Sequence, residues 1–219
     1  MSQIFDSIAE TYDGWYEKSE GRAIFNAELK CLRSLCANCR GRWLEAGVGT
    51  GRFAFNLGID VGVDPSMPML GIAKNRGIRV SAGRAEALPF PEHSFDGVLL
   101  ALALCFMEDP SRALQECARV MRPEGRLVLG VIPAESVWGR VYEIKKAEGH
   151  PVYASARFLN AQEIVSSIET IGFVCRGAAS TLFWAPDTQP DAEPLVKDGF
   201  SPDAGFLGLL FKKTDDIAA

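Results

Sequence analysis

Short apolar runs alternate with amphipathic stretches through the middle of the chain. Five of the runs have the length of buried strands: 42–46, 60–63, 78–81, 95–101 and 125–132. Apolar residues recur at helical spacing over 51–57, 67–75 and 110–121. Alternating strands and helices predict a mostly parallel sheet with helices on both faces. Right-handed connections then leave a crevice at the carboxyl ends of the strands.

The first forty residues are predicted to be helical. Ile4, Ile8 and Tyr12 recur every four residues, and a second apolar face follows further along. The pairs Asp13-Gly14 and Glu20-Gly21 interrupt this pattern. We therefore expect two helices with a break between them.

After Pro133 the pattern changes. A helix is expected over 137–144, followed by a second helix with Asn160 as its N-cap and Glu163 at the third helical position. The last two strands and the long loop between them are expected at 173–175, 206–211 and 186–203.

The composition fits one globular domain of 219 residues. Hydrophobic residues make up 47% of the chain and charged residues 23%, so it can bury a sizeable core. The net charge of −5 and the lack of a Lys/Arg cluster argue against nucleic acid as a partner. No apolar run reaches the roughly 18 residues of a membrane span, and the N-terminus does not resemble a signal peptide. We expect a cytoplasmic monomer or homodimer without a membrane partner.

Three of the six cysteines, Cys31, Cys36 and Cys39, lie close together and contain a C-x-x-C pattern. A metal site needs further ligands at regular spacing, and the two histidines are distant in sequence. Half-buried thiols on an apolar helix and its exit loop are therefore the preferred interpretation, with a redox or metal role as the alternative.

The most informative segment is residues 43–51, Trp-Leu-Glu-Ala-Gly-Val-Gly-Thr-Gly. A short apolar run ends in three alternating glycines, and an apolar helical face follows. Glycine is required where the backbone adopts positive φ or where a ligand approaches closely. A helix that begins at such a turn presents unpaired N–H groups to whatever binds there. The segment thus predicts a strand, a ligand-binding turn and a helix.

The spacing of the turn separates two ligand classes. A dinucleotide fingerprint reads G-x-G-x-x-G, whereas here Arg52 occupies the position of the third glycine. Glu45 precedes the turn, and its carboxylate would repel a pyrophosphate but suit an ammonium or sulfonium group. Asp64 ends the next predicted strand, where a carboxylate can accept hydrogen bonds from ribose hydroxyls. An ordinary helix N-cap is the alternative role for Asp64.

Five segments in this order resemble the class I S-adenosylmethionine (SAM)-dependent methyltransferases of the type 11 family. They are Leu44-Glu-Ala-Gly-Val-Gly-Thr-Gly51, Gly62-Val-Asp-Pro-Ser66, Gly83-Arg-Ala-Glu-Ala-Leu-Pro-Phe90, Ser94-Phe-Asp-Gly-Val98 and Arg119-Val-Met-Arg-Pro-Glu-Gly-Arg-Leu127. The resemblance covers about residues 5–175. It implies an α/β Rossmann-like three-layer sandwich with a mostly parallel seven-stranded sheet and an antiparallel last strand.

The resemblance divides this single domain, residues 1–219, into three parts. Residues 1–40 would form a helical lid, 41–132 the cofactor-binding core, and 133–219 the acceptor-side segment with the last strands. The cofactor would be SAM and its product S-adenosylhomocysteine (SAH). The residues implied in cofactor binding are Tyr12, Trp15, Glu45, Gly47, Gly49, Gly51, Asp64, Pro65, Ser66, Met67, Ala85, Glu86, Ala101 and Leu102.

Within that set, the resemblance gives Glu45 the methionine amino group and Asp64 the ribose. Met67 would cover the adenine, and Glu86 would lie near the adenine edge. The lid aromatics Tyr12 and Trp15 could close over the cofactor, or could simply pack on the sheet.

Residues on the acceptor side are less strongly marked. By the same resemblance, the segment after the fifth strand shapes the acceptor pocket, which gives as candidates Phe106, Trp138, Tyr142, Tyr153 and Arg157. His150 is a candidate general base because histidine titrates near neutral pH, although a histidine beside proline is more often a loop residue. No residue pattern calls for a metal, and the small-molecule acceptor is not identified.

Two other functions stay open. A SAM-binding sensor or non-catalytic partner subunit would carry the same motifs. An NAD-dependent oxidoreductase has a similar fold, but the early third glycine and Glu45 argue against it.

Overall fold

The structure is a computed structural model that describes residues 2–36, 40–188, 190 and 193–214. The strands are β1 Trp43–Ala46, β2 Val61–Asp64, β3 Arg79–Ala82, β4 Phe95–Ala101, β5 Met121–Val131, β6 Phe173–Thr181, β7 Lys197–Asp198 and β8 Phe206–Lys213. The helices are α1 Ser2–Trp15, α2 Ser19–Cys36, α3 Arg52–Leu57, α4 Met67–Asn75, the 3₁₀ helix η1 Leu104–Phe106, α5 Pro110–Val120, α6 Val137–Ala147 and α7 Ala161–Glu169.

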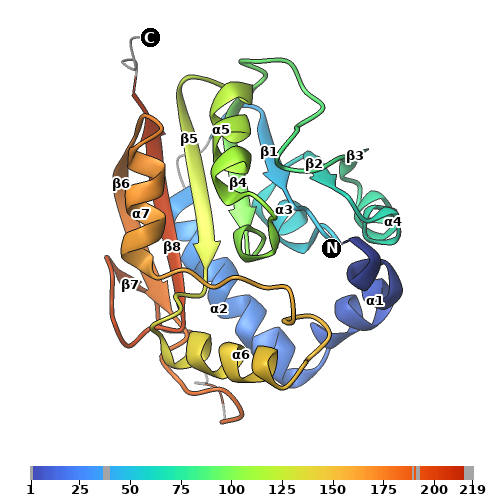
Figure 1. Cartoon of the computed structure of the whole chain (residues 1–219), viewed down its shortest axis with the longest axis vertical. Coiled ribbons are helices and arrows are strands. Elements are labelled where there is room, and N and C mark those ends of the chain that lie inside the picture. Colours follow the sequence, from blue (N-terminus) through green and yellow to red (C-terminus); the bar gives the residue numbers. More distant parts are fainter. Residues whose placement is uncertain (1, 37–39, 189, 191–192, 215–219) are drawn as a thin grey trace.

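These strands form one mixed sheet in the order β3-β2-β1-β4-β5-β8-β6-β7 (Figure 1). Strands β1 to β5 are parallel, and β8 lies antiparallel between β5 and β6. The predicted Rossmann-like α/β sandwich with an antiparallel last strand is confirmed. The strand number differs, because the two residues of β7 lie in the predicted loop and pair with Ala179 and Ser180 of β6.

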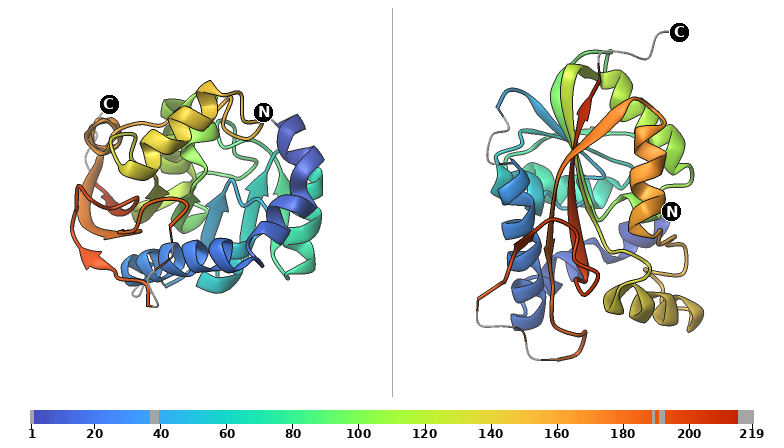
Figure 2. Two further views of the ribbon diagram at one scale, coloured as in Figure 1. Left: turned by 90° about the horizontal axis from the view of Figure 1, so that it is seen from below. Right: turned by 90° about the vertical axis from the view of Figure 1, so that its left-hand side faces the viewer.

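Helices cover both faces of the sheet (Figure 2). Side chains alternate along β4, so Val98 and Leu100 pack in one hydrophobic cluster with residues of α5 and α7. Leu99 points the other way, into a cluster with residues of α2, α3 and α4. Because β4 is buried on both faces, it appears in the sequence as a continuous apolar run rather than as an alternating one.

Strand β5 begins four residues before the predicted start at 125. Met121 pairs with Phe95, and the register then shifts before Gly97 pairs with Arg126. Residues 121–125 therefore form an irregular first part of β5, whereas Pro123 and Gly125 predict the end of the preceding helix.

The two N-terminal helices are confirmed, but the break lies elsewhere than predicted. Asp13 and Gly14 belong to the last turn of α1, and the connection runs through residues 16–18. Gly21 lies inside α2, where a Cβ would collide with the backbone oxygen of Trp15. This glycine therefore permits the close approach of two helices rather than ending one.

At the other end of the chain, the predicted capping box is confirmed. Asn160 Oδ1 accepts the Glu163 N–H at 2.9 Å, and the Glu163 carboxylate accepts the Asn160 N–H at 3.1 Å. Figure 1 shows α1 and α6 beyond the carboxyl end of the parallel strands. These two helices thus border the crevice at that edge of the sheet.

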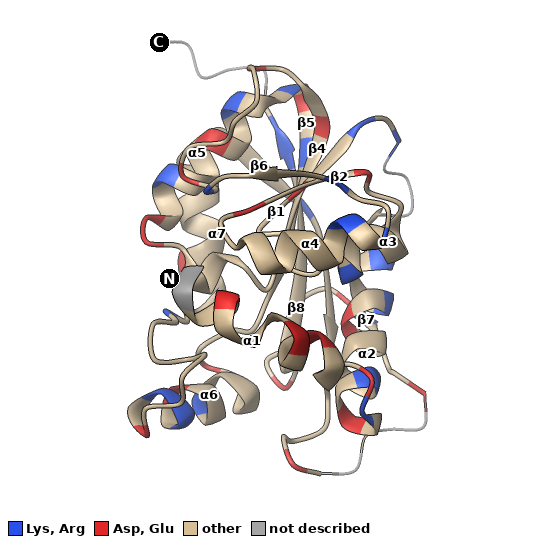
Figure 3. Cartoon of the chain, turned by 90° about the vertical axis from the view of Figure 1, so that its right-hand side faces the viewer, with Lys and Arg blue, Asp and Glu red and all other residues tan. Residues whose placement is uncertain are grey.

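In the part of the chain that the structure describes, no helix has the length and apolarity to cross a bilayer. Figure 3 shows Lys and Arg interspersed with Asp and Glu over several elements of the face in view. The cytoplasmic location and the monomeric or homodimeric state stay predictions.

Candidate active site

The glycine turn between β1 and α3 has the geometry that its sequence predicts. Gly47, Gly49 and Gly51 have φ values of 77°, 50° and 80°. A Cβ on Gly47 would lie 2.6 Å from the Cβ of Ala103, so this position has room only for glycine. The Gly47 N–H donates to Val63 O at 2.8 Å, which holds the turn against the end of β2.

Asp64 at the end of β2 fastens this turn to the next one. Its Oδ2 accepts the Gly49 N–H and its Oδ1 accepts the Ser66 N–H, both at 2.9 Å. Burial raises the pKa of Asp64, and these two hydrogen bonds oppose the effect. The N-cap of α4 is Ser66, whose hydroxyl accepts the Met69 N–H, so the alternative role of Asp64 as that cap is wrong.

A cavity of about 210 Å³, here called the turn cavity, lies beside the glycine turn. Ten of the predicted cofactor-binding residues line it: Tyr12, Gly47, Gly49, Asp64, Pro65, Ser66, Ala85, Glu86, Ala101 and Leu102. Its other lining residues were not predicted to bind the cofactor: Phe5, Met69, Arg84, Ala103, Phe106 and Met107. Phe106 among them was predicted for the acceptor side.

The structure places four predicted cofactor residues elsewhere. Met67 is 65% exposed at the start of α4, and Met69 on the inner side of the helix takes its place in the turn cavity. Gly51 is the N-cap residue of α3 and packs against Ala73 of α4. Trp15 lines the second cavity described below. Met67 does not line the turn cavity, and its role of covering the adenine stays a prediction.

Glu45 is the fourth of these residues. It is 1% exposed and lies behind the glycine turn instead of on either cavity wall. Burial raises its pKa well above the ordinary value, against a hydrogen bond from the backbone of Ala54. Its Oε2 has no hydrogen-bond partner in the structure.

Glu86 lines the turn cavity with a carboxylate that is already engaged. Its Oε1 accepts the Glu108 N–H at 2.9 Å and forms an ion pair with Arg84 at 3.3 Å. Burial raises the pKa of Glu86, but its hydrogen bonds outweigh burial and hold the pKa below the ordinary value. The side chain therefore has less capacity for a ligand than Asp64.

A second and larger cavity of about 500 Å³, here called the aromatic cavity, lies between α1, α2 and α6. All the predicted acceptor-side residues and the candidate base line it: Phe106, Trp138, Tyr142, His150, Tyr153 and Arg157. Tyr142 and Tyr153 stack with their ring centroids 4.5 Å apart. His150 is an exposed residue of the rim, 4.9 Å from the Tyr153 ring.

The two cavities share part of their walls. Tyr12, Leu102 and Phe106 line both of them. Leu102 has a φ of 55°, and its N–H donates to Gly130 O, which fixes the chain where β4 ends. The two cavities therefore adjoin at these three residues.

The sequence reasoning missed Glu28, which lines the aromatic cavity from α2. Its signal was present, because Glu28 lies four residues after Ile24 and four before Leu32 on the apolar face of that helix. An acidic residue in the middle of such a face is rarely buried without a partner.

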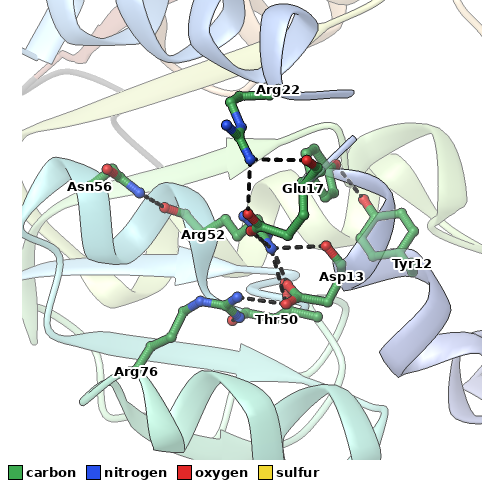
Figure 4. A network of polar contacts seen from close by, with 9 residues as sticks. Tyr12, Asp13, Glu17, Arg22, Thr50, Arg52, Asn56 and Arg76 are labelled. Atoms are coloured by element: carbon green, nitrogen blue, oxygen red, sulfur yellow. Dashed lines mark hydrogen bonds and ion pairs between the residues drawn. The ribbon is translucent and has the colours of Figure 1, made fainter. Parts of the chain in front are cut away.

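Helix α1 is fastened to the glycine turn by a network of ion pairs (Figure 4). The Asp13 carboxylate contacts Arg52 of α3 at 2.8 Å and Arg76 after α4 at 2.6 Å. Arg76 also donates to Thr50 O inside the turn. Burial raises the pKa of Asp13, but the two arginines outweigh it and hold the pKa at about 2.

Cys31 and Cys36, the two described members of the cysteine cluster, line neither cavity. Cys31 is buried on α2, where its thiol donates to Ala179 O, and burial raises its pKa to about 12. Cys39 lies outside the described residues. Among the residues that are described, no three metal-binding side chains come together.

Residues 44–129 match the family model described as "Methyltransferase domain". An uncharacterised protein of Methanocaldococcus jannaschii is 37% identical over 96% of this chain and 98% of its own length. A demethylmenaquinone methyltransferase of Renibacterium salmoninarum is 29% identical over 78% of this chain and 76% of its own.

Among solved structures, this chain is similar to a Thermotoga maritima protein described as a SAM-dependent methyltransferase and possible histamine N-methyltransferase. The two are 35% identical and superpose with a TM-score of 0.89, over 97% of this chain and 99% of the other. The likeness therefore extends beyond the nucleotide-binding half of the fold, into the segments that form the aromatic cavity.

Proposed function

The chain belongs to the SAM-dependent methyltransferases, and from that premise we propose that it methylates a small molecule held in the aromatic cavity. One observation carries the proposal: Tyr12, Leu102 and Phe106 line both cavities. A donor in the turn cavity and an acceptor in the aromatic cavity would then be direct neighbours where these shared walls meet. Such an arrangement brings two reactants together in a fixed orientation.

The residues of the turn cavity fit SAM. Asp64 uses one lone pair of each oxygen for a backbone N–H, which leaves one on each for the ribose hydroxyls. Gly47 and Gly49 let the ligand approach the backbone, and Met69, Ala85 and Met107 supply apolar contacts.

SAM, when bound, supplies a methyl group that a nucleophile displaces from sulfur. The chain's own contribution is position and exclusion of water. Tyr12 and Phe106 lie on the shared wall, and Phe5 of α1 packs edge-on against Phe106 with centroids 5.2 Å apart. A general base is needed only for an acceptor that must lose a proton, and His150 on the rim is the candidate for that role.

The test is incubation with methyl-labelled SAM and fractions of a metabolite extract. Transfer of label to a small molecule supports the proposal. Binding of SAM and SAH by calorimetry without any transfer would instead favour a sensor or partner subunit. Binding of NAD with no response to SAM would overturn the assignment of the turn cavity.

The names of the relatives suggest two chemical classes of acceptor, a biogenic amine and a quinone. Because only an amine is cationic near neutral pH, the charges of the aromatic cavity discriminate between them.

A further inference from the structure

Glu28 is a buried acid without a counter-charge. Its side chain is 1% exposed, and its Oε2 has no hydrogen-bond partner. It lines the aromatic cavity but not the turn cavity. Glu45 is the other buried carboxyl with an unpartnered oxygen among the described residues, but it lines neither cavity. Glu28 is thus the unpaired acid that a ligand in the aromatic cavity can reach.

Aromatic side chains from two parts of the chain line the same cavity as Glu28. Glu28 acts electrostatically on Tyr12 of α1 and on Tyr16 just after it, and also on Tyr142 of α6 and on Tyr153. Trp138 extends the second group, with its ring 6.1 Å from that of Tyr142. Faces of tyrosine and tryptophan rings attract cations, most strongly where water is excluded.

A lone buried carboxylate is costly, and a ligand that brings the opposite charge removes that cost. We propose that the acceptor carries a positively charged amine or quaternary ammonium group, which binds between these rings with Glu28 as its counter-ion. The proposal rests on the proposed function and adds the chemical class of the substrate.

The charges around the cavity agree with this role. Its rim carries Glu20, Lys145, Arg157 and Asp187, two of each sign, together with His150. The titratable groups on which Glu28 acts are Tyr12, Tyr16, Cys31, Tyr142 and Tyr153, all of them uncharged near neutral pH. Burial raises the pKa of Glu28 to about 8, and no cation of the described chain counters it.

The experiment measures binding of benzyltrimethylammonium to the protein saturated with SAH. This probe is cationic at every pH and cannot be methylated, so binding is separated from turnover. A neutral aryl probe, 2-phenylethanol, is measured in parallel. Calorimetry should show that Glu28→Gln weakens the cation at least tenfold and leaves the neutral probe within twofold.

Two control variants test whether the effects on cation binding are specific to Glu28. Glu10→Gln removes the same charge from an exposed position of α1 that lines neither cavity, and should change the affinity for the cation less than threefold. In the wild type, the affinity for the cation should increase about tenfold for each pH unit as the pH is raised towards 8, and should level off above pH 8. The reason is that the cation binds the ionised carboxylate of Glu28. This dependence should persist in His150→Gln and vanish in Glu28→Gln.

The outcomes separate the two proposals. Equal binding of the cation to wild type and Glu28→Gln, or no binding at all, would overturn the counter-ion role while SAH binding still supports the cofactor assignment. Preferential loss of 2-phenylethanol in Glu28→Gln would point to a protonated Glu28 that donates to a neutral acceptor, and would overturn it too. Failure of the wild-type protein to bind SAH would instead contradict the proposed function. Unchanged SAH affinity in Glu28→Gln shows that the variant is folded.

Discussion

Replacing Asp64 with alanine should weaken SAM and SAH while leaving the fold in place. The carboxylate holds the glycine turn through Gly49 and the following turn through Ser66, and each oxygen keeps one lone pair for a ribose hydroxyl. Hydrogen bonds to a charged group contribute about 1.5–3 kcal/mol. At about 1.4 kcal/mol per factor of ten, the dissociation constant should rise by roughly 10–150-fold.

Calorimetric titration with SAH measures this directly, with thermal unfolding of the unliganded variant as the check on folding. Glu86→Ala is the matched control, since its carboxylate lines the same cavity but is engaged by Arg84 and the Glu108 N–H. It should weaken SAH less than Asp64→Ala does. An Asp64→Ala protein that folds normally and binds SAH as tightly as wild type would refute the ribose role.

Three further predictions concern α1 and the glycine turn. Asp13→Asn should lower the free energy of unfolding by about 2 kcal/mol at pH 7. The pKa of Asp13 is about 2 in the folded protein and 3.8 in the unfolded chain, so the ionised carboxylate stabilises the folded state above pH 4. In urea unfolding, the difference in free energy of unfolding between wild type and Asp13→Asn should become smaller as the pH falls from 4 towards 2. A difference that does not change with pH would exclude the ion pairs of Asp13 as its cause. Hydrogen exchange of residues 5–12 should slow when SAH binds, whereas equal protection with and without SAH would mean that α1 is fixed packing instead of a lid. Gly47→Ala should lower the stability by roughly 1–3 kcal/mol, because the backbone has positive φ there and the new Cβ would collide with Ala103. Adding Ala103→Gly to this variant should restore part of the loss. If it restores none, the contact with Ala103 is not the cause.

The geometry of the glycine turn was predictable because the backbone conformation determines it. Gly47, Gly49 and Asp64 act through short-range features that recur in sequence order, so their positions follow from the strand ends. The choice between Met67 and Met69 was not predictable in this way, since α4, which begins at Met67 with Ser66 as its N-cap, turns Met69 towards the turn cavity. A shift of two residues on a helix moves a side chain to another face.

The acceptor side was harder to predict because its walls come from segments far apart in the chain. The candidates after β5 were found by resemblance, and their stacking with one another could not be inferred from spacing. Glu28 was missed because a helical acid is normally solvated, and only the tertiary arrangement of α1, α2 and α6 closes over it.

The division of the two cavities along the chain has an evolutionary consequence. Most of the turn cavity comes from residues 47–107, inside the family match of 44–129. Apart from Leu102 to Phe106, the aromatic cavity comes from residues 8–28 and 130–187, outside that match. If the two cavities hold donor and acceptor as proposed, the outer segments can change to suit a new acceptor while the segment within the family match keeps the donor site, so membership of this family predicts the donor more reliably than the compound that receives the methyl group.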